Sequence, residues 1–304
     1  MGTPSIRQLE YAVALADHLH FGEAASVSNV TQPALSAQIR ELENRLGTVL
    51  FERGTTGTTL TTAGYDVVER AREILRAVGE LEAVAAAHDG DVRGPLRIAA
   101  IPTIAPYLLP AIVEGIQTHW PDARVVIEEL QSKALIADVE SGNLDLGVLA
   151  TPYDTGQLHV ESLCEEPFKL AIRDDHALAR GHASVPMEVL TDLHVLLLSE
   201  GHCLRDHARH ACEIAGRAEH SEVKASSIAT LARMVASGMG ATLIPASAAA
   251  IETRAGSGVT TRDFEHPAPG RTVALVWRRS DPRSDLFMAL SPTVQAGVKR
   301  AVGR

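Results

Sequence analysis

The sequence predicts an α/β protein in which an all-α N-terminal domain and one long helix precede an α/β region of two lobes. Apolar residues recur at helical spacing over most of residues 5–88, whereas short apolar strands alternate with helical segments from residue 96 onward. Gly90, Gly94 and Pro95 interrupt the chain between these two patterns. Because 304 residues exceed what one hydrophobic core usually organises, we expect separate domains.

The N-terminal part has the apolar spacing of three helices, which we expect near residues 5–16, 21–27 and 31–47. A turn at residues 29–30 precedes the third helix, for which Thr31 is a good N-cap and Pro33 a good first-turn residue. Gly47 is expected to end it. The stretch LFERGTTGTTLT that follows has the glycine and threonine content of a short hairpin. Residues 1–62 are therefore predicted to form a winged helix-turn-helix domain.

A long helix is predicted from about Thr62 to His88. Its apolar residues alternate steps of four and three, which indicates a coiled-coil seam and dimerisation, although an ordinary amphipathic helix is the alternative. The seam consists of Val67, Ala71, Ile74, Val78, Leu81 and Ala85. We assign residues 63–93 to this dimerisation helix and the hinge that follows it.

The remaining residues, 94–304, are expected to form two α/β lobes. Strands are predicted at LRIAAI, RVVIEEL and LDLGVLA, separated by helices, and this alternation is typical of parallel βαβ units. More strands are predicted at FKLAIR, HVLLLS, EVKAS and ATLIP, with helices near residues 205–216 and 227–237. The strand TVALVW and a final helix are expected to return to lobe I. Lobe I comprises about residues 94–165 and 270–304, and lobe II about residues 166–269, with crossovers near 164–167 and 267–271.

Composition restricts the functions that the chain can have. It contains neither an 18-residue apolar run nor a signal-peptide pattern, so a cytoplasmic protein without membrane attachment is expected. Three cysteines are too few for a secreted disulfide framework and fit no zinc site, so we expect neither a cofactor nor a metal. The net charge is −10, and residues 1–62 carry four Arg, no Lys and six acidic residues. DNA binding is therefore predicted from the helix-turn-helix pattern and not from charge.

Several motifs resemble a known family. The run FGEAASVSNVTQPALSAQIRELENRLGTVLFER resembles the winged helix-turn-helix of LysR-type transcriptional regulators, and TQPALSAQIRELE is its most specific part. GPLRIAAIPTIAPYLLP, ESGNLDLGVLA and LLLSEGHCLRDHARHAC resemble the peroxide-sensing regulators of that family. The resemblance implies a regulatory domain like that of periplasmic binding proteins, assembly into homodimers and homotetramers, and no enzymatic activity. It implies double-stranded promoter DNA, hydrogen peroxide and RNA polymerase as partners.

The resemblance also implies which residues meet DNA, namely Thr31, Gln32, Pro33, Ser36, Arg40 and Arg53. Gln32 and Arg40 can donate to base edges, and Ser36 to a phosphate or a base. Arg53, in the expected hairpin, is the best phosphate ligand. Gly22, Glu23 and residues 55–59 stand where relatives often carry basic side chains, so the target sequence is not implied.

For the sensing chemistry the resemblance implies that Cys203 reacts with peroxide and that Cys212 resolves the product. The implied peroxide pocket contains Thr103, Ser132, His202, Arg205, Asp206 and Arg278. Ser132 departs from the threonine expected there but keeps the hydroxyl. Peroxide would oxidise Cys203 to a sulfenic acid, which condenses with the second thiol.

The residues around Cys203 agree with this role on physical grounds. A thiol reacts as its thiolate, and Cys203 is expected at a helix N-terminus between His202 and Arg205, where the dipole and a cation favour the anion. On one continuous helix, Cys203 and Cys212 would be separated by roughly 13 Å. A disulfide tolerates a Cα separation of at most about 7 Å, so the bond would require the helix to unwind. A local oxidation would thereby change the shape of the domain.

Other functions are open at this point. A LysR-type regulator can bind a small organic effector between its lobes, which would leave the cysteines incidental. A cysteine-dependent enzyme would pair Cys203 with His202, but adjacent residues rarely face each other. A solute-binding protein does not account for the helix-turn-helix. Cys164 is expected to pack inertly, and His207 and His210 to lie on a solvated helix face and not in a metal site.

Overall fold

The computed structural model describes residues 3–54, 57–88, 92, 95–181, 183–216 and 225–303. The chain forms two compact units, Met1–Ala85 and Ala86–Arg304. One hydrophobic core lies in the first unit and two lie in the second. Within the described ranges, no helix is both long and apolar enough to cross a membrane.

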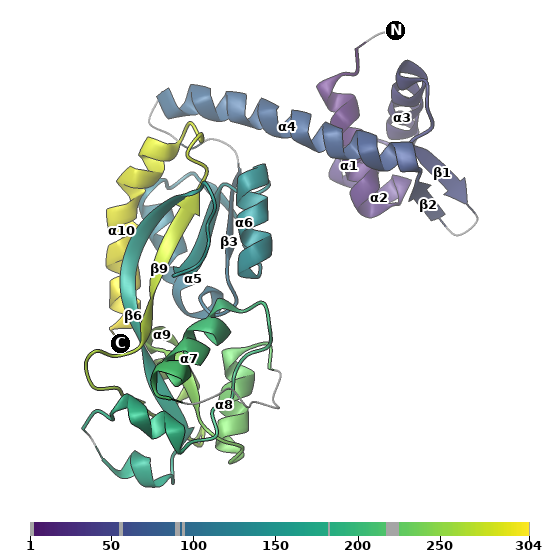
Figure 1. The fold of residues 1–304 in the computed structure, drawn as a ribbon. Coiled ribbons are helices and arrows are strands. Elements are labelled where there is room, and N and C mark those ends of the chain that lie inside the picture. Colours follow the sequence, from purple (N-terminus) through teal and green to yellow (C-terminus); the bar gives the residue numbers. More distant parts are fainter. Residues whose placement is uncertain are drawn as a thin grey trace. The chain divides into compact units, whose positions relative to one another are not determined.

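The first unit contains three helices, a hairpin and most of a long helix (Figure 1). These elements are α1 (Ile6–His18), α2 (Phe21–Val27), α3 (Gln32–Leu46), β1 (Phe51–Gly54), β2 (Gly57–Leu60) and α4 (Thr62–His88). Asn29 has φ 53° in the turn before α3, and Gly47 has φ 71° at its end, so left-handed residues bound this helix. Thr31 is the N-cap of α3, as predicted, but its side chain makes no capping hydrogen bond. The predicted helix-turn-helix and hairpin are confirmed.

The first turns of α4 complete the core of this unit. Its fully buried side chains from the other helices include Leu15, Leu35, Ile39 and Leu42. Ala71 is buried among them, and Val67 packs against them, although the sequence assigned both to a coiled-coil seam. Further along α4, Ile74 is 46% exposed and Leu81 is 70% exposed. The seam is therefore corrected at its start, and the exposed residues of the predicted seam begin at Ile74.

Gly64 shows how closely α4 approaches the loop before β1. A Cβ at Gly64 would lie 2.1 Å from the carbonyl oxygen of Leu50. We expect Gly64→Ala to destabilise the unit by about 1–3 kcal/mol, because the backbone must shift. Gly79→Ala, on the same helix, meets nothing within 4 Å and should stabilise it by up to about 1 kcal/mol. Hydrogen exchange of α1–α3 in the full chain measures both effects, and equal exchange in the two variants would contradict this packing.

The second unit is built on a sheet to which its described part contributes seven strands, in the order β4-β3-β5-β9-β6-β7, with β8 also paired to β6. The strands are β3 (Pro95–Ala100), β4 (Arg124–Glu129), β5 (Leu146–Thr151), β6 (His159–Arg173), β7 (Thr242–Pro245), β8 (Val259–Asp263) and β9 (Gly270–Trp277). β3 pairs in parallel with β4 and β5, which confirms the predicted βαβ units. β9 runs antiparallel to β5.

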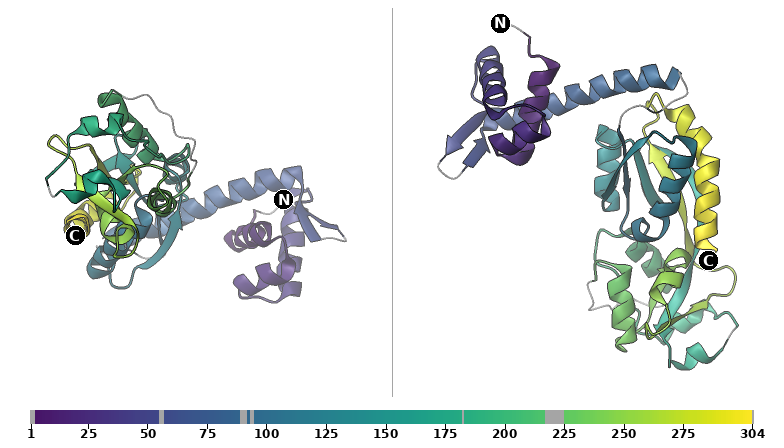
Figure 2. Two further views of the ribbon diagram at one scale, coloured as in Figure 1. Left: turned by 90° about the horizontal axis from the view of Figure 1, so that it is seen from below. Right: turned by 180° about the vertical axis from the view of Figure 1, so that it is seen from behind.

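Helices cover the sheet in both lobes (Figure 2). In lobe I, α5 (Ala105–His119) and α10 (Ser284–Val302) pack together on one face, and α6 (Ser132–Ser141) packs on β5 and β9. Lobe II contains the short helices η1 (Ala177–Arg180), η2 (Met187–Thr191) and α9 (Ala246–Glu252), and the longer α7 (Cys203–Ile214) and α8 (Ile228–Ala236). This two-lobed α/β arrangement confirms the predicted fold class.

The strands β6 and β9 connect the two lobes (Figure 1). Residues 159–167 of β6 pair with β9 in lobe I, and from Phe168 onward β6 pairs with β7 and β8 in lobe II. The chain returns to lobe I between the end of β8 at Asp263 and the start of β9 at Gly270. The domain boundaries assigned from sequence stay a prediction. The two segments that run between the lobes position the site described below.

The structure corrects one expectation for lobe II. The segment HVLLLS is not a regular strand, and its described residues form only isolated bridges, Val195 with Ala241 and Leu198 with Ala225. Its leucines are buried in the core, so packing and not strand pairing accounts for the apolar run. EVKAS lies mostly outside the described residues. Sequence patterns did not indicate β8, α9 or the first half of β6, where HVESLCEEP mixes polar and apolar side chains.

Candidate functional site

Cys203 lies between the cores of the two lobes. It is the first residue of α7, is 2% exposed and packs with the core of lobe I, whereas its neighbour Leu204 packs in lobe II. Ser132, the first residue of α6, is equally buried and its hydroxyl hydrogen bonds to the Cys203 sulfur. The N-terminal ends of α6 and α7 therefore meet at this thiol, where both helix dipoles favour a negative charge.

A network of buried polar residues lies where β6 and β9 pass between the lobes. The Arg271 guanidinium donates to Glu166 Oε2 at 2.8 Å, to the Thr103 hydroxyl at 2.8 Å and to the Thr103 carbonyl at 3.0 Å. The other Glu166 oxygen accepts from the backbone N–H of Ser247 at 2.9 Å. The side chains of Arg271 and Glu166 have no exposed surface. The network thus joins lobe I, both connecting strands and lobe II.

Burial is the largest influence on the ionisation of Cys203, and it raises the pKa of the thiol above its ordinary value. The charge of Arg271, the Ser132 hydroxyl and the backbone N–H of Leu204 lower the pKa, and the charge of Asp206 raises it. The predicted lowering of the pKa is therefore wrong. The cost of charging a thiol inside the core outweighs the lowering by Arg271, Ser132 and the Leu204 N–H.

Arg278 does not lie beside the cysteine, contrary to expectation. Its guanidinium donates to the carbonyl oxygens of Val139 at 2.9 Å and Leu144 at 3.1 Å, and to the Asp281 carboxylate at 3.1 Å. Val139 is seven residues beyond Ser132 on α6, which corresponds to about 10 Å of helix. Arg278 therefore holds the far end of α6, away from the thiol.

Arg271 and Glu166 are the site residues that sequence reasoning missed. They are direct partners in the β6–β9 register, and only this pairing brings them together, since 105 positions separate them in the chain. The sequence signal was weak: one cation near the start of an apolar strand. Tyr107 and Glu252 were missed for the same reason, and their hydrogen bond of 2.8 Å also joins lobe I to lobe II.

His202, the N-cap of α7, is 5% exposed. Burial lowers the pKa of its ring, and the charge of Glu129 raises it. The Nδ1 atom is buried and has no hydrogen-bond partner in the described part of the structure. A buried ring nitrogen without a partner is available to a small polar molecule in the site.

Arg205 and Asp206 have partners other than the thiol. The Arg205 guanidinium donates to the carbonyl oxygen of Leu198 at 3.2 Å, within lobe II. Asp206 lies 3.6 Å from Arg209 on the exposed side of α7 and acts on Cys203 only through its charge. The six predicted pocket residues are thus divided: Thr103, Ser132 and His202 are buried in this region, and the other three bond elsewhere.

Cys212 lies in the same helix as Cys203. It is 4% exposed and packs in the core of lobe II, and both cysteines are free thiols. Because α7 is continuous over the nine positions that separate them, their separation along the helix is about 13 Å. A disulfide, with its limit of about 7 Å between Cα atoms, therefore requires α7 to unwind.

The other candidate ligands give no metal centre. Cys164, in β6, is half-buried, and burial raises the pKa of its thiol to about 11. His210 lies 3.9 Å from Glu213 on the exposed side of α7. Among the residues that the structure describes, no three His, Cys, Asp or Glu side chains are grouped as metal ligands would be.

The surface of α3 carries the predicted DNA contacts. Four of these residues are exposed, namely Thr31, Gln32, Pro33 and Arg40. Ser36 is only 7% exposed, its hydroxyl accepts from Arg40 Nη2 at 3.4 Å and its carbonyl accepts from Arg40 Nε at 3.3 Å. Ser36 therefore orients Arg40, and its direct contact with DNA stays a prediction. Arg53 lies in β1, but its side chain is outside the described structure.

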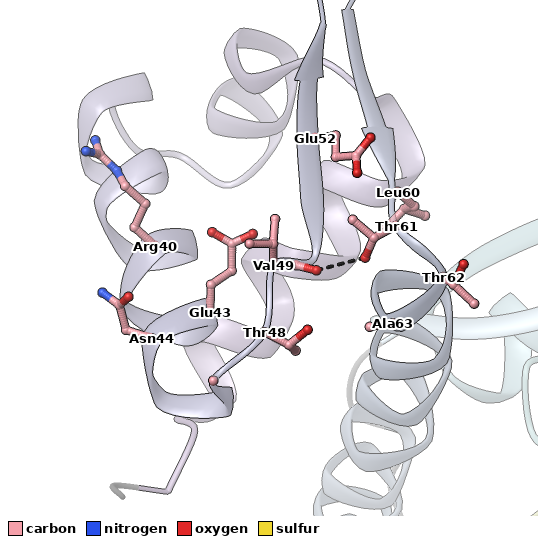
Figure 3. Close-up of a pocket in the computed structure, with 11 residues that line it drawn as sticks. Arg40, Glu43, Asn44, Thr48, Val49, Glu52, Leu60, Thr61, Thr62 and Ala63 are labelled. Atoms are coloured by element: carbon pink, nitrogen blue, oxygen red, sulfur yellow. Dashed lines mark hydrogen bonds between the residues drawn. The ribbon is translucent and has the colours of Figure 1, made fainter.

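An open hollow separates α3 from the hairpin and the start of α4 (Figure 3). Glu43 on α3 lies across it from Glu52 on β1, with Thr61 beside the start of α4. The Glu43 carboxylate accepts from the backbone N–H of Leu50 at 2.8 Å, and the Thr61 hydroxyl donates to the Val49 carbonyl at 2.8 Å. These bonds fix the hairpin relative to α3, so both can meet one duplex as a rigid surface.

A winged helix-turn-helix followed by a long helix and a two-lobed α/β domain is the architecture of a DNA-binding regulator with a separate sensing domain. The chain belongs to the LysR family of bacterial regulators. The model "Bacterial regulatory helix-turn-helix protein, lysR family" matches residues 6–65, and the model "LysR substrate binding domain" matches residues 89–297. The family resemblance inferred from sequence is confirmed.

Within this family, the chain is similar to peroxide regulators over nearly its full length. It is 41% identical to the hydrogen peroxide-inducible genes activator of Pectobacterium carotovorum, over 96% of each chain. It is 40% identical to the DNA-binding transcriptional dual regulator OxyR of Escherichia coli, over 96% of this chain and 95% of that one. These relatives are transcription regulators and not enzymes, as expected for this chain.

Solved structures give the same result. A full-length OxyR variant from Pseudomonas aeruginosa is 34% identical, with a TM-score of 0.73 over 97% of this chain and 96% of that one. A hydrogen peroxide-bound OxyR variant from Corynebacterium glutamicum is 32% identical, with a TM-score of 0.69 over 99% of this chain and 95% of that one.

Proposed function

We propose that the chain is a cytoplasmic DNA-binding transcription regulator of peroxide-stress genes, which senses hydrogen peroxide through Cys203 and Cys212. The observation that supports this most is the buried Cys203 thiol at the meeting point of two helix N-termini, where the charge of Arg271 acts to lower its pKa. The names of the relatives, which cover nearly the whole chain, support the same oxidant. In this proposal residues 1–62 bind promoter DNA, residues 63–93 dimerise and residues 94–304 form the regulatory domain.

The sensing reaction has two steps. The Cys203 thiolate attacks one oxygen of hydrogen peroxide, so that an S–O bond forms while the O–O bond breaks, giving a sulfenic acid and hydroxide. Arg271 and the Ser132 hydroxyl stabilise the thiolate and the negative charge that passes to the leaving oxygen. In the second step the Cys212 sulfur displaces the sulfenic hydroxyl, which leaves as water when the disulfide forms.

The disulfide changes the shape of the regulatory domain. Cys203 packs with lobe I and Cys212 with lobe II, so joining them removes the first turns of α7 from their contacts. We expect the contacts in a homodimer and homotetramer to change as a result, and RNA polymerase to respond to that change. The exposed apolar residues of α4 support dimerisation, namely Ile74, Leu81 and Val84.

A titration of the purified protein with hydrogen peroxide, in which free thiols are counted, tests this function. Of the three free cysteines we expect two to be lost together, with a mass decrease of two hydrogens and with Cys164 still reduced. Retention of all thiols would favour the alternative, a LysR-type regulator that responds to a small organic effector in the cleft between the lobes.

Gln32 and Arg40 are expected to carry sequence recognition. Replacing either by Ala should cost about 1–3 kcal/mol of binding free energy on the cognate site and weaken discrimination between sequences. Arg53→Ala should instead weaken binding to all sequences alike. Arg45→Ala is the matched control, since it also removes a cation from α3. It should reduce DNA binding less, because Arg45 already pairs with Glu41 at 2.9 Å. Footprints and binding curves at several salt concentrations measure these effects. Unchanged footprints after both recognition-helix substitutions would contradict the assignment.

A further inference from the structure

A second side chain of α7 bonds to lobe I. His207 Nε2 lies 3.1 Å from the carbonyl oxygen of Pro152, the residue that follows β5. His207 is one helical turn beyond Cys203, so the two side chains lie on the same face of α7. The first two turns of α7 are therefore attached to lobe I at two points, through the Cys203–Ser132 and His207–Pro152 hydrogen bonds.

The surroundings of His207 select one form of its ring. A carbonyl oxygen only accepts, so Nε2 carries the proton that bonds to Pro152. Nδ1 is buried and has no hydrogen-bond partner among the described residues. The ring lies near Phe168 of β6, with 6.2 Å between centroids. The neutral ring fits this site, because a proton on Nδ1 would have no acceptor.

Tyr153 follows Pro152 in the loop after β5, and charges on α7 influence it. This side chain packs against the core of lobe I. Burial raises the pKa of Tyr153, and negative charges at Cys203 and Asp206 raise it further. Tyr153 is thus under the electrostatic influence of the first turn of α7. Pro152, through its bond to His207, contacts the part of α7 that must leave lobe I when the disulfide forms.

We propose that His207 is a positioning residue that holds the first two turns of α7 against lobe I in the thiol form. This inference rests on the proposed function, in which α7 unwinds before Cys212 reaches the sulfenic acid of Cys203. The His207–Pro152 hydrogen bond must break in that step, so it adds to the barrier of disulfide formation. It does not act in the peroxide step, since its bonded nitrogen is directed to Pro152 and not to the thiol.

Rapid mixing of the full-length protein with hydrogen peroxide separates the two steps. In a Cys212→Ser background, His207→Ala should leave the rate of sulfenic acid formation unchanged. With Cys212 present, His207→Ala should form the disulfide about two- to tenfold faster, the factor that one hydrogen bond of ordinary net strength contributes. His207→Gln, whose amide can donate to the same carbonyl, should restore most of the wild-type rate. His210→Ala is the matched control, because His210 is exposed on the same helix.

The pH dependence of the disulfide rate is a further test, because a role of His207 in packing alone would not produce it. Burial lowers the pKa of His207 from 6.5, Arg271 and His210 lower it further, and the Pro152 bond and Asp206 raise it. A lowered pKa means that burial of the neutral ring favours the attached form fully above pH 6.5, and that this preference is lost as the pH falls through the lowered pKa. The Nε2–H bond itself persists, but the protonated ring is costly to bury. The ratio of the wild-type to the His207→Gln disulfide rate should therefore rise on acidification, and a flat ratio would count against the inference.

Hydrogen exchange of the thiol form tests the attachment without redox chemistry. Amides of α7 should exchange faster in His207→Ala than in the wild type or His210→Ala. Equal exchange together with an unchanged disulfide rate would overturn the inference. A slower sulfenic acid step in His207→Ala would also overturn it, because His207 would then act on peroxide. A wild type that forms no disulfide would overturn the proposed function instead, and the exchange result would still decide whether His207 holds α7.

Discussion

Cys203→Ser should abolish the peroxide response, whereas Cys212→Ser should keep the first chemical step and lose the second. A serine hydroxyl forms no comparable anion at neutral pH, so Cys203→Ser should neither consume peroxide nor form a disulfide. Cys212→Ser leaves a sulfenic acid at Cys203, which should oxidise further to the sulfinic or sulfonic acid. Mass spectrometry distinguishes the two, since added oxygens replace the loss of two hydrogens.

Cys164→Ser is the control for this pair of variants. Burial raises the pKa of the Cys164 thiol to about 11, and Cys164 lies within strand β6 and not at a helix N-terminus as Cys203 does, so its loss should not change the response. On oxidation the wild type should also gain protease sensitivity in α7, and Cys212→Ser should not gain it in full. A disulfide formed by Cys203→Ser under mild peroxide would falsify the assignment of the two roles.

The first unit could be predicted almost completely because its signals are local. A capping serine at Ser5, a left-handed Asn29 and a terminal Gly47 mark helix ends within a few residues of sequence. Thr62 and His88 bound α4 as predicted. What the sequence did not reveal is where α4 stops contacting the other helices, because Ala71 fits both a core and a coiled-coil seam.

Lobe II was harder to predict because its strands depend on distant partners. HVLLLS has the composition of a buried strand, yet its described residues form two isolated bridges and pack as an extended core segment. The first half of β6 pairs with β9 and has α10 beside it, an environment that accepts the acidic residues of HVESLCEEP. Periodicity alone identifies neither arrangement, since both are set by tertiary contacts.

Prediction of the candidate site was limited in the same way, because local motifs do not show contacts between distant residues. The two cysteines could be predicted from one motif, but the arginine that acts on Cys203 could not. Arg271 and Arg278 stand at opposite ends of β9, seven residues or about 23 Å apart in an extended strand. Only the crossover between the lobes brings the Arg271 end to α7. The sign of the pKa shift at Cys203 depends on burial, which the surrounding GHCLRD sequence does not reveal.

Arg271→Met should therefore affect both stability and sensing. It leaves the Glu166 carboxylate unpaired in a site without exposed surface, which should cost about 3–5 kcal/mol of folding free energy. It also removes a cation that lowers the pKa of Cys203, so less thiolate is present at a given pH. The pH profile of sulfenic acid formation should shift to higher pH. Thermal unfolding and rapid-mixing rates between neutral and alkaline pH measure the two effects.

A double variant separates stability from sensing. In Arg271→Met with Glu166→Leu, the buried pair is replaced by apolar side chains, so most of the lost stability should return. The pH profile should stay shifted, because the cation beside Cys203 is still absent. Arg278→Met is the matched loss of an arginine: it removes bonds to the end of α6 and should lower the unfolding temperature without moving the profile. If the double variant regains the wild-type profile, or Arg278→Met shifts it as far, Arg271 does not set the reactivity of Cys203.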